Sequence, residues 1–232
     1  MQEILASVDS DRDFYERLRR CVLKGNERMN LTRIVEPEEF LRKHVLDSLL
    51  PFLVVPALRD LPADRLVLAD LGSGAGFPGL PISRLRPGWT ITLLERTRKK
   101  AAFLAETVDE LELRNVRVLA ADAREAAPLL GRCDVVTARA VGEIAEVVRA
   151  AKGLLAPKGA IVHYKGDVGG EELEEGAAAA EKLGLVQEGP FPYALPPDAK
   201  RAVVLSRSTG RTRGAARPPK GARRRTRGGR GR

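Results

Sequence analysis

Cysteine is nearly absent from this sequence: Cys21 and Cys133 are the only two among 232 residues. Two cysteines this far apart form neither a disulfide framework nor the close spacing of a metal site. We therefore expect two buried free thiols in a reducing compartment, and we expect no metal centre.

Long apolar runs are also missing. The most apolar stretch, residues 49–58, is short and is interrupted by Pro51 and Pro56, whereas a membrane-spanning helix needs about 20 apolar residues. The N-terminal segment is acidic and lacks the apolar centre of a signal peptide. These absences predict a cytoplasmic protein with no membrane partner.

Acidic residues stop well before the end of the chain. From Arg207 onward there are eleven Lys or Arg and no Asp or Glu. Removing those eleven from the 40 basic residues leaves 29 against 31 acidic ones, so residues 1–206 carry a net charge of −2 although the whole chain carries +9. We expect residues 208–232 to be a disordered basic tail that either contacts RNA phosphate or only keeps the chain solvated.

The most informative stretch is residues 66–79, LVLADLGSGAGFPG. Its short apolar start is typical of a strand buried on both faces of a parallel sheet. Glycines then follow at alternate positions, and because glycine has no Cβ their backbone can approach a ligand closely. Pro78 suits the first turn of a helix. The stretch therefore predicts a strand, a glycine loop and a helix.

Two glycine fingerprints overlap in this loop. Gly74, Gly76 and Gly79 have the spacing of dinucleotide sites. Asp70 with Gly72, Gly74 and Gly76 instead matches the first motif of class I S-adenosylmethionine (SAM) methyltransferases. A carboxylate at the strand end disfavours a pyrophosphate and favours a ligand with a sulfonium and an ammonium group. SAM is therefore the favoured cofactor, and a nicotinamide-dependent oxidoreductase is the alternative.

Strand and helix patterns alternate after the loop. A second strand ends before Glu95, which can accept both ribose hydroxyls of either ligand. The alternation predicts a doubly wound parallel sheet, and the last two strands, joined without a crossover helix, predict an antiparallel end. This is the Rossmann-like α/β fold of a class I methyltransferase. The expected strands are 66–71, 89–94, 116–120, 133–138, 159–165, 185–191 and 202–207, and the expected helices are 79–86, 97–112, 143–153 and 171–184.

Two helices are predicted before the sheet, one over residues 10–29 and one that begins at Pro37. His44, Asp47 and Ser48 lie one turn apart on a face of the second helix. They serve either helix packing or substrate binding.

The segment after the fourth strand is Thr137-Ala138-Arg139-Ala140-Val141. It lacks the Asn or Asp followed by Pro-Pro and an aromatic residue that is usual in enzymes that methylate exocyclic amines. It also lacks a cysteine nucleophile, because Cys133 lies at the other end of the strand. What remains compatible is a nucleophile that needs no proton removed, such as guanine N7, for which positioning and desolvation supply catalysis.

Several segments together carry a family resemblance. They are NLT at residues 30–32, HVLDS at 44–48, DLGSGAGFPGLP at 70–81, TARAV at 137–141 and YKG at 164–166. With these segments in this order, the chain resembles the bacterial 16S rRNA (guanine-N7) methyltransferases, the RsmG family, also known as glucose-inhibited division protein B. The resemblance covers about residues 10–207.

The resemblance implies a SAM-dependent enzyme that methylates guanine N7 in 16S rRNA, as naked RNA or in the small-subunit particle. We expect a helical extension over residues 1–60, a SAM-binding core over 61–207 and, from its composition, the tail over 208–232, and we expect a monomer. The family often has an acidic residue where this chain has Arg124, so only a backbone contact carries over there. The Arg-rich extension lies outside the family's usual span.

The motifs, the strand ends and the resemblance provide candidate residues for three roles. We expect Arg139 and Lys165 to be catalytic, although an ion pair of Arg139 with Glu95, Asp122 or Glu143 is the structural alternative. A nonenzymatic RNA-binding module is a further alternative for the chain as a whole. The glycine motif and the end of the second strand give Asp70, Gly72, Gly74, Gly76 and Glu95 as expected cofactor-binding residues. The resemblance implies further cofactor contacts at Phe77, Ala123, Arg124 and Arg139. The expected RNA-binding residues are Arg33, Arg42, Lys43, His44 and Lys165.

Overall fold

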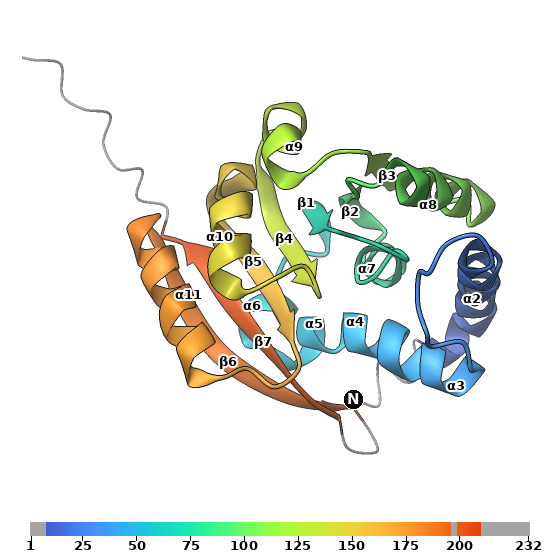
Figure 1. Cartoon of the computed structure of the whole chain (residues 1–232), viewed down its shortest axis with the longest axis horizontal. Coiled ribbons are helices and arrows are strands. Elements are labelled where there is room, and N and C mark those ends of the chain that lie inside the picture. The colour runs from blue at the N-terminus through green and yellow to red at the C-terminus, as the bar shows by residue number, and fades with distance from the viewer. Residues whose placement is uncertain (1–7, 196–198, 210–232) are drawn as a thin grey trace, which may run out of the picture.

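The computed structural model describes residues 8–195 and 199–209, and a seven-stranded sheet in the order β3-β2-β1-β4-β5-β7-β6 forms its centre (Figure 1). Neighbours from β3 through β5 are parallel, whereas β7 is antiparallel to both β5 and β6. The predicted mostly parallel sheet with an antiparallel last strand is confirmed. The strands are β1 Asp64–Leu71, β2 Gly88–Leu94, β3 Val116–Leu119, β4 Cys133–Arg139, β5 Leu155–Lys165, β6 Leu185–Leu195 and β7 Ala199–Ser208.

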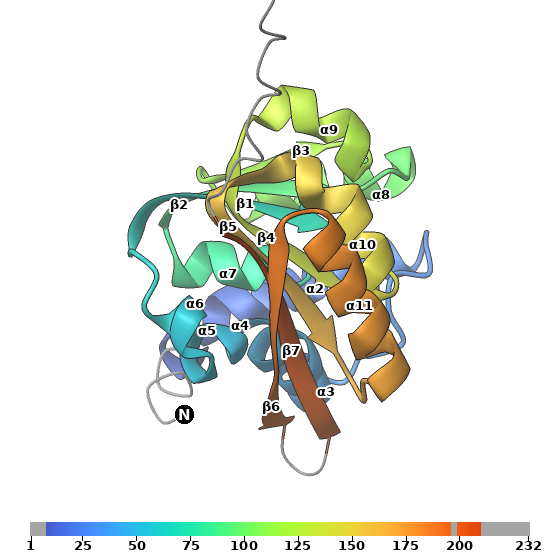
Figure 2. The same ribbon diagram turned by 90° about the vertical axis from the view of Figure 1, so that its left-hand side faces the viewer.

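Helices cover both faces of this sheet (Figure 2). One face carries α7 (Gly79–Leu85) and α8 (Arg98–Glu110), and the other carries α9 (Ala123–Leu130), α10 (Ile144–Ala151) and α11 (Gly170–Lys182). A 3₁₀ turn, η2 (Lys152–Leu154), follows α10. Two separate apolar clusters, one on each face, hold these layers to the sheet.

The N-terminal residues pack onto the same face as α7 and α8. They form α2 (Arg12–Asn26), α3 (Pro37–Phe40), η1 (Leu41–Leu46), α4 (Asp47–Leu49), α5 (Pro51–Val54) and α6 (Pro56–Arg59). Their apolar side chains join the cluster of that face, and Phe52 meets Trp89 edge-on at 5.8 Å between ring centroids. The division at residue 60 stays a prediction, because helical extension and sheet share one apolar cluster.

Two elements differ from the expectation. The helix that begins at Pro37 contains a π-helical turn, η1, which periodicity does not predict. Helix α9 was not predicted, although Asp122 and Glu125 form a capping box that is visible in the sequence.

The two thiols are both free, but only Cys133 is buried. Burial raises the pKa of the Cys133 thiol to about 11. The expectation of a buried thiol is wrong for Cys21, which is half-buried in the surface of α2. The predicted basic tail lies outside the described residues except for Ser208 and Thr209. Over the ranges that the structure describes, no helix has the length and apolar character needed to cross a membrane.

Candidate active site

The glycine loop follows β1 directly and turns three times through left-handed backbone. Gly72, Gly74 and Gly76 have φ angles of +61°, +57° and +97°, a region that side chains disfavour. The Ser73 amide donates to the Leu94 carbonyl at 3.0 Å, which ties the loop to the end of β2. Alternate glycines in the sequence are therefore needed for the backbone path.

Asp70 supports this loop from beneath. Its carboxylate is fully buried, accepting from the Gly79 amide at 3.1 Å and from the Thr137 hydroxyl at 2.7 Å. It thereby joins the end of β1 to the start of α7 and to β4. Burial raises the Asp70 pKa to about 6, against the lowering effect of these hydrogen bonds.

This raised pKa predicts a pH dependence of stability. Between about pH 4 and 6 the folded protein holds a proton on Asp70 that the unfolded chain has lost, so stability falls as the pH rises through this window. Relative to Asp70→Asn, which keeps the size of the side chain, the wild type should lose about 2 kcal/mol of unfolding free energy from pH 4 to pH 7. Urea unfolding of both proteins without ligand measures this difference.

The comparison with Asp70→Asn is needed because two buried histidines also make stability depend on pH. Burial lowers the pKa of His44 and His163 to about 3, so their contribution raises stability as the pH rises through the same range. Parallel stability curves for wild type and Asp70→Asn would contradict the raised Asp70 pKa.

A first cavity of about 410 Å³ opens beyond the carboxyl ends of β1, β2 and β4. Glu95, only 6% exposed, lines it, and its carboxylate accepts from the Gly74 amide at 3.2 Å and the Thr97 amide at 2.8 Å. These two donors fix a carboxylate at the position from which both hydroxyls of a ribose can be held. The other lining residues are Leu71, Gly72, Leu94, Arg96, Thr97, Lys100, Ala121, Asp122, Ala123, Ala140, Val141, Val147 and Ala150.

Of the predicted cofactor residues, Gly72, Glu95 and Ala123 line the first cavity, and Gly74 contacts it through Glu95. Asp70, Gly76, Phe77, Arg124 and Arg139 are not among its lining residues. The Arg124 side chain is exposed, and its amide donates to the capping carboxylate of Asp122 at 2.8 Å. Phe77 stacks on His44, with 4.5 Å between ring centroids and 8° between the planes.

A second cavity, of about 400 Å³, adjoins the first, and Ala140 lines both. Ala140 has a φ angle of +56°, which is strained for a residue with a side chain. Basic and phenolic groups dominate the walls, which come from the N-terminal helices, β4, β5 and the β6–β7 pair. The lining residues are Ile34, Lys43, His44, Asp47, Arg139, Ala140, Tyr164, Lys165, Gly166, Tyr193 and Arg201.

Arg139 reaches from the end of β4 to the π-helical turn of the N-terminal segment. Its guanidinium donates to Asp47 Oδ2 at 3.1 Å, to His44 Nδ1 at 3.2 Å and to the Lys43 carbonyl at 3.3 Å. It also lies 5.4 Å from the centre of the Phe77 ring. The structural alternative, an ion pair of Arg139 with Glu95, Asp122 or Glu143, is wrong as to the partner, because the guanidinium pairs with Asp47.

His44 is held as a neutral imidazole. Burial, with the positive charges of Arg139 and Lys43, lowers its pKa to about 3. A guanidinium can only donate, so Nδ1 accepts from Arg139 and the proton resides on Nε2, which donates to the Thr32 hydroxyl at 2.9 Å. The NLT, HVLDS and TARAV segments, far apart in the chain, therefore meet in one hydrogen-bonded network.

Asp47 connects several of the side chains that line the second cavity. Besides Arg139, its carboxylate accepts from the Tyr193 hydroxyl at 2.9 Å and lies 3.4 Å from Arg201 Nε. Burial and the Asp47 charge raise the Tyr193 pKa well above its usual value, so this phenol stays a donor. Sequence reasoning missed Tyr193 and Arg201, because they face Asp47 only after the antiparallel strands join the sheet.

The predicted RNA-binding residues divide into two groups. Lys43, His44 and Lys165 line the second cavity, whereas Arg33 is exposed and Arg42 half-buried outside it. Lys43 pairs with Glu39. Lys165 donates to the Gly142 carbonyl at 2.8 Å and lies 2.5 Å from Glu172, so its ammonium group joins β5 to the β4–α10 loop and to α11.

The sheet order, the left-handed glycine loop and the carboxylate at the end of β2 define a class I methyltransferase. Solved structures agree on the fold: a methyltransferase from Pyrococcus furiosus has a TM-score of 0.53 at 16% identity over 65% of this chain and 78% of that one. The fibrillarin pre-rRNA processing protein of Methanococcus jannaschii has a TM-score of 0.52 at 19% identity over 65% and 70%.

Sequence comparison identifies the family within this class. The family model for GidB, rRNA small subunit methyltransferase G, matches residues 13–190. Proteins named ribosomal RNA small subunit methyltransferase G are 39% identical in Microcystis aeruginosa, over 72% of this chain and 77% of the relative, and 37% identical in Deinococcus radiodurans, over 83% and 76%. The chain belongs to the rRNA small subunit methyltransferase G family, which confirms the resemblance predicted from its motifs.

Proposed function

We propose that the protein methylates N7 of a guanine in 16S rRNA, using SAM bound in the first cavity and the target guanine bound in the second. The observation that carries this proposal is that Ala140 lines both cavities, at the carboxyl edge of the sheet. A methyl donor and an acceptor bound there would be neighbours.

The first cavity fits SAM. Glu95 would accept the ribose hydroxyls, and Gly72 in the lining presents backbone rather than a side chain to the ligand. When bound, SAM supplies an electrophilic methyl group on a positively charged sulfur.

The second cavity lacks a free base within the described residues that line it. The Asp47 carboxylate is occupied by Arg139 and Tyr193, and both nitrogens of neutral His44 are engaged. An exocyclic amine would have to lose a proton, whereas N7 attacks with a lone pair and keeps the new positive charge on the ring. The residues of this cavity therefore favour N7, for which their task is to position the base.

Three cations of this cavity suit RNA. Arg139, Lys165 and Arg201 can donate to guanine O6 or to phosphate oxygens. We propose that the partner is 16S rRNA, free or in the small-subunit particle, and that the protein acts in the cytoplasm as a monomer without a bound metal.

Incubation of the full-length protein with methyl-labelled SAM and unmethylated 16S rRNA or small-subunit particles tests this function. We expect label at one guanine, where borohydride and aniline treatment then cleaves the RNA, because N7 methylation weakens that ring. Label that resists this cleavage, or label on N1, N2 or C5 of a base, would contradict the mechanism.

A further inference from the structure

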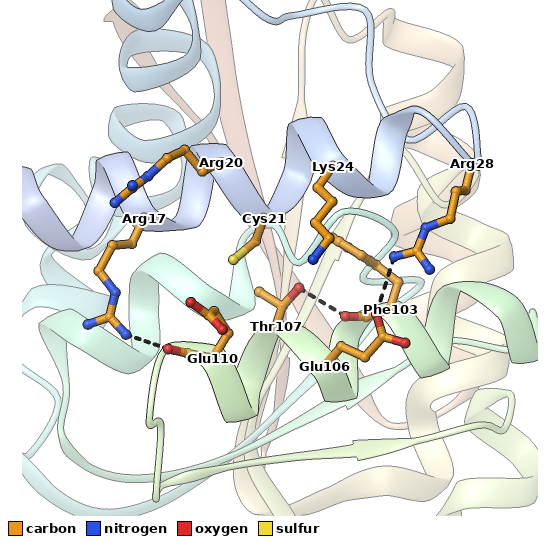
Figure 3. A pocket seen from close by; sticks show the side chains of 9 residues that line it. All are labelled: Arg17, Arg20, Cys21, Lys24, Arg28, Phe103, Glu106, Thr107 and Glu110. Atoms are coloured by element: carbon orange, nitrogen blue, oxygen red, sulfur yellow. Dashed lines mark hydrogen bonds and ion pairs between the residues drawn. The ribbon is translucent and has the colours of Figure 1, made fainter.

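A third hollow, of about 400 Å³, lies between α2 and α8 and shares no lining residue with the two cavities above (Figure 3). We propose that this α2–α8 groove binds the sugar–phosphate backbone of the RNA substrate at a point away from the target guanine. This inference rests on the proposed function, which supplies RNA as the substrate class.

Four basic side chains follow one another along the groove. Arg17, Arg20 and Lys24 project from α2 at intervals of three and four residues, and Arg28 follows in the turn after this helix (Figure 3). On a helix such intervals share one side, and successive charges rise by about 4.5 to 6 Å. A row of regularly spaced cations suits the row of phosphates along an RNA strand. Lys and Arg bind these phosphates whatever the nucleotide sequence.

Part of this row is not neutralised by the protein. Arg28 pairs with Glu106 at 3.3 Å, and Arg17 donates to the main-chain carbonyl of Glu110. Arg20 and Lys24 are exposed and form no ion pair or hydrogen bond to any residue in 8–195 or 199–209. Arg20 acts on Glu16 only through a longer-range electrostatic interaction, because the Glu16 carboxylate is already paired with Arg19. The Arg28–Glu106 pair is more than half exposed on both sides, so it is weak and can open to a competing anion.

The α2–α8 groove is more positively charged than the folded part of the chain as a whole. Its lining contains four basic residues and two acidic ones, a net charge of +2, whereas residues 1–206 together carry −2. The cationic heads therefore form a local positive region, which attracts a polyanion more than the average charge of the folded part would.

The floor of the groove is firmly packed. A side chain at Gly25 would lie 2.5 Å from the Phe103 ring, so the absence of a Cβ lets α2 approach α8 closely there. Phe103 is 3% exposed and Thr107 donates to its carbonyl at 2.9 Å. The basic row is thus held on a fixed surface, which suits a bound RNA strand that must deliver one guanine at a set distance.

The double variant Arg20→Gln/Lys24→Gln of the full-length chain tests this groove. Removing two phosphate contacts should weaken binding to 16S rRNA at low salt and make the slope of log affinity against log salt shallower by about 1.4 to 1.8. The affinity for SAM and the rate at saturating RNA should stay unchanged. The matched control is Arg149→Gln/Lys182→Gln, which removes the same charge from exposed positions on α10 and α11, over the opposite face of the sheet.

The outcomes separate this inference from the proposed function. If the wild type methylates rRNA but the groove variant keeps the wild-type salt slope, the groove proposal is overturned alone. An equal loss of RNA affinity in the control variant also overturns the groove proposal, because removing positive charge anywhere on the surface would then weaken RNA binding to the same extent. Weaker binding to the small-subunit particle, with unchanged binding to protein-free 16S rRNA, assigns the groove to an acidic protein surface and overturns RNA as its partner.

Discussion

Replacing Gly74 by valine is expected to lower the affinity for SAM at least 100-fold, about 2.7 kcal/mol. The Gly74 backbone has a φ angle of +57°, which costs a side-chain-bearing residue about 1 to 2 kcal/mol and a β-branched one more. Relaxing that strain moves the amide that donates to Glu95, so the loop and the carboxylate that we propose binds the ribose are both displaced. Isothermal titration with SAM measures the loss.

Gly184→Val is the control for this experiment. Gly184 has a similar φ angle of +72°, and a Cβ there would have no atom within 4 Å, but it lies between α11 and β6 at the other edge of the sheet. The control should suffer the same strain and still bind SAM like the wild type. Wild-type SAM affinity in Gly74→Val, with a native circular dichroism spectrum, would contradict the assignment of the first cavity.

Replacing Arg139 by alanine is expected to lower kcat/KM for RNA by about 100-fold or more, with SAM affinity within a few-fold of the wild type. The arginine lines the second cavity only, and its three hydrogen bonds hold the π-helical turn against β4. Its removal also leaves the buried Asp47 carboxylate without its main cation, so we expect a lower melting temperature. Rates with a range of RNA concentrations and thermal unfolding measure both effects.

Two further variants, Arg201→Ala and Arg139→Lys, separate the loss of activity in Arg139→Ala from its loss of stability. Arg201 shares Asp47 but lies farther away, at 3.4 Å, and is more exposed, so its loss should cost activity less. Arg139→Lys keeps the charge without the planar fork that reaches three acceptors, so it should recover stability better than activity. A large loss of SAM affinity in Arg139→Ala would contradict the placement of Arg139 in the substrate cavity.

The glycine loop could be predicted in detail because its information is local. The buried strand, the alternate glycines and Pro78 are consecutive, and each constrains the same few backbone angles. Glu95 was predicted as a ligand-facing carboxylate for a similar reason, since the carboxyl ends of parallel strands share one edge of the sheet. The capping box of α9 was equally local and could have been used.

Other features depend on residues that are distant in the chain. Asp70 was expected to face the ligand, yet it supports the loop because Thr137 of the neighbouring strand β4 donates to it. The partner of Arg139 could not be found by reading along β4, because Asp47 comes from a helix 92 residues earlier in the chain. Periodicity also assumes a regular helix, so it could not indicate the π-helical turn that carries Lys43 and His44.

The chain order of strands, helices and glycines therefore specifies the fold class, the family and the path of the glycine loop, because hydrophobic period and backbone freedom act over short stretches. The second cavity arises only when the N-terminal helices, β4 and the antiparallel β6–β7 pair are packed together, since Asp47, Arg139 and Tyr193 are brought within hydrogen-bonding distance by the sheet order. The α2–α8 groove has the same origin: the basic row is visible in the sequence, but its floor is formed by a helix about 80 residues away.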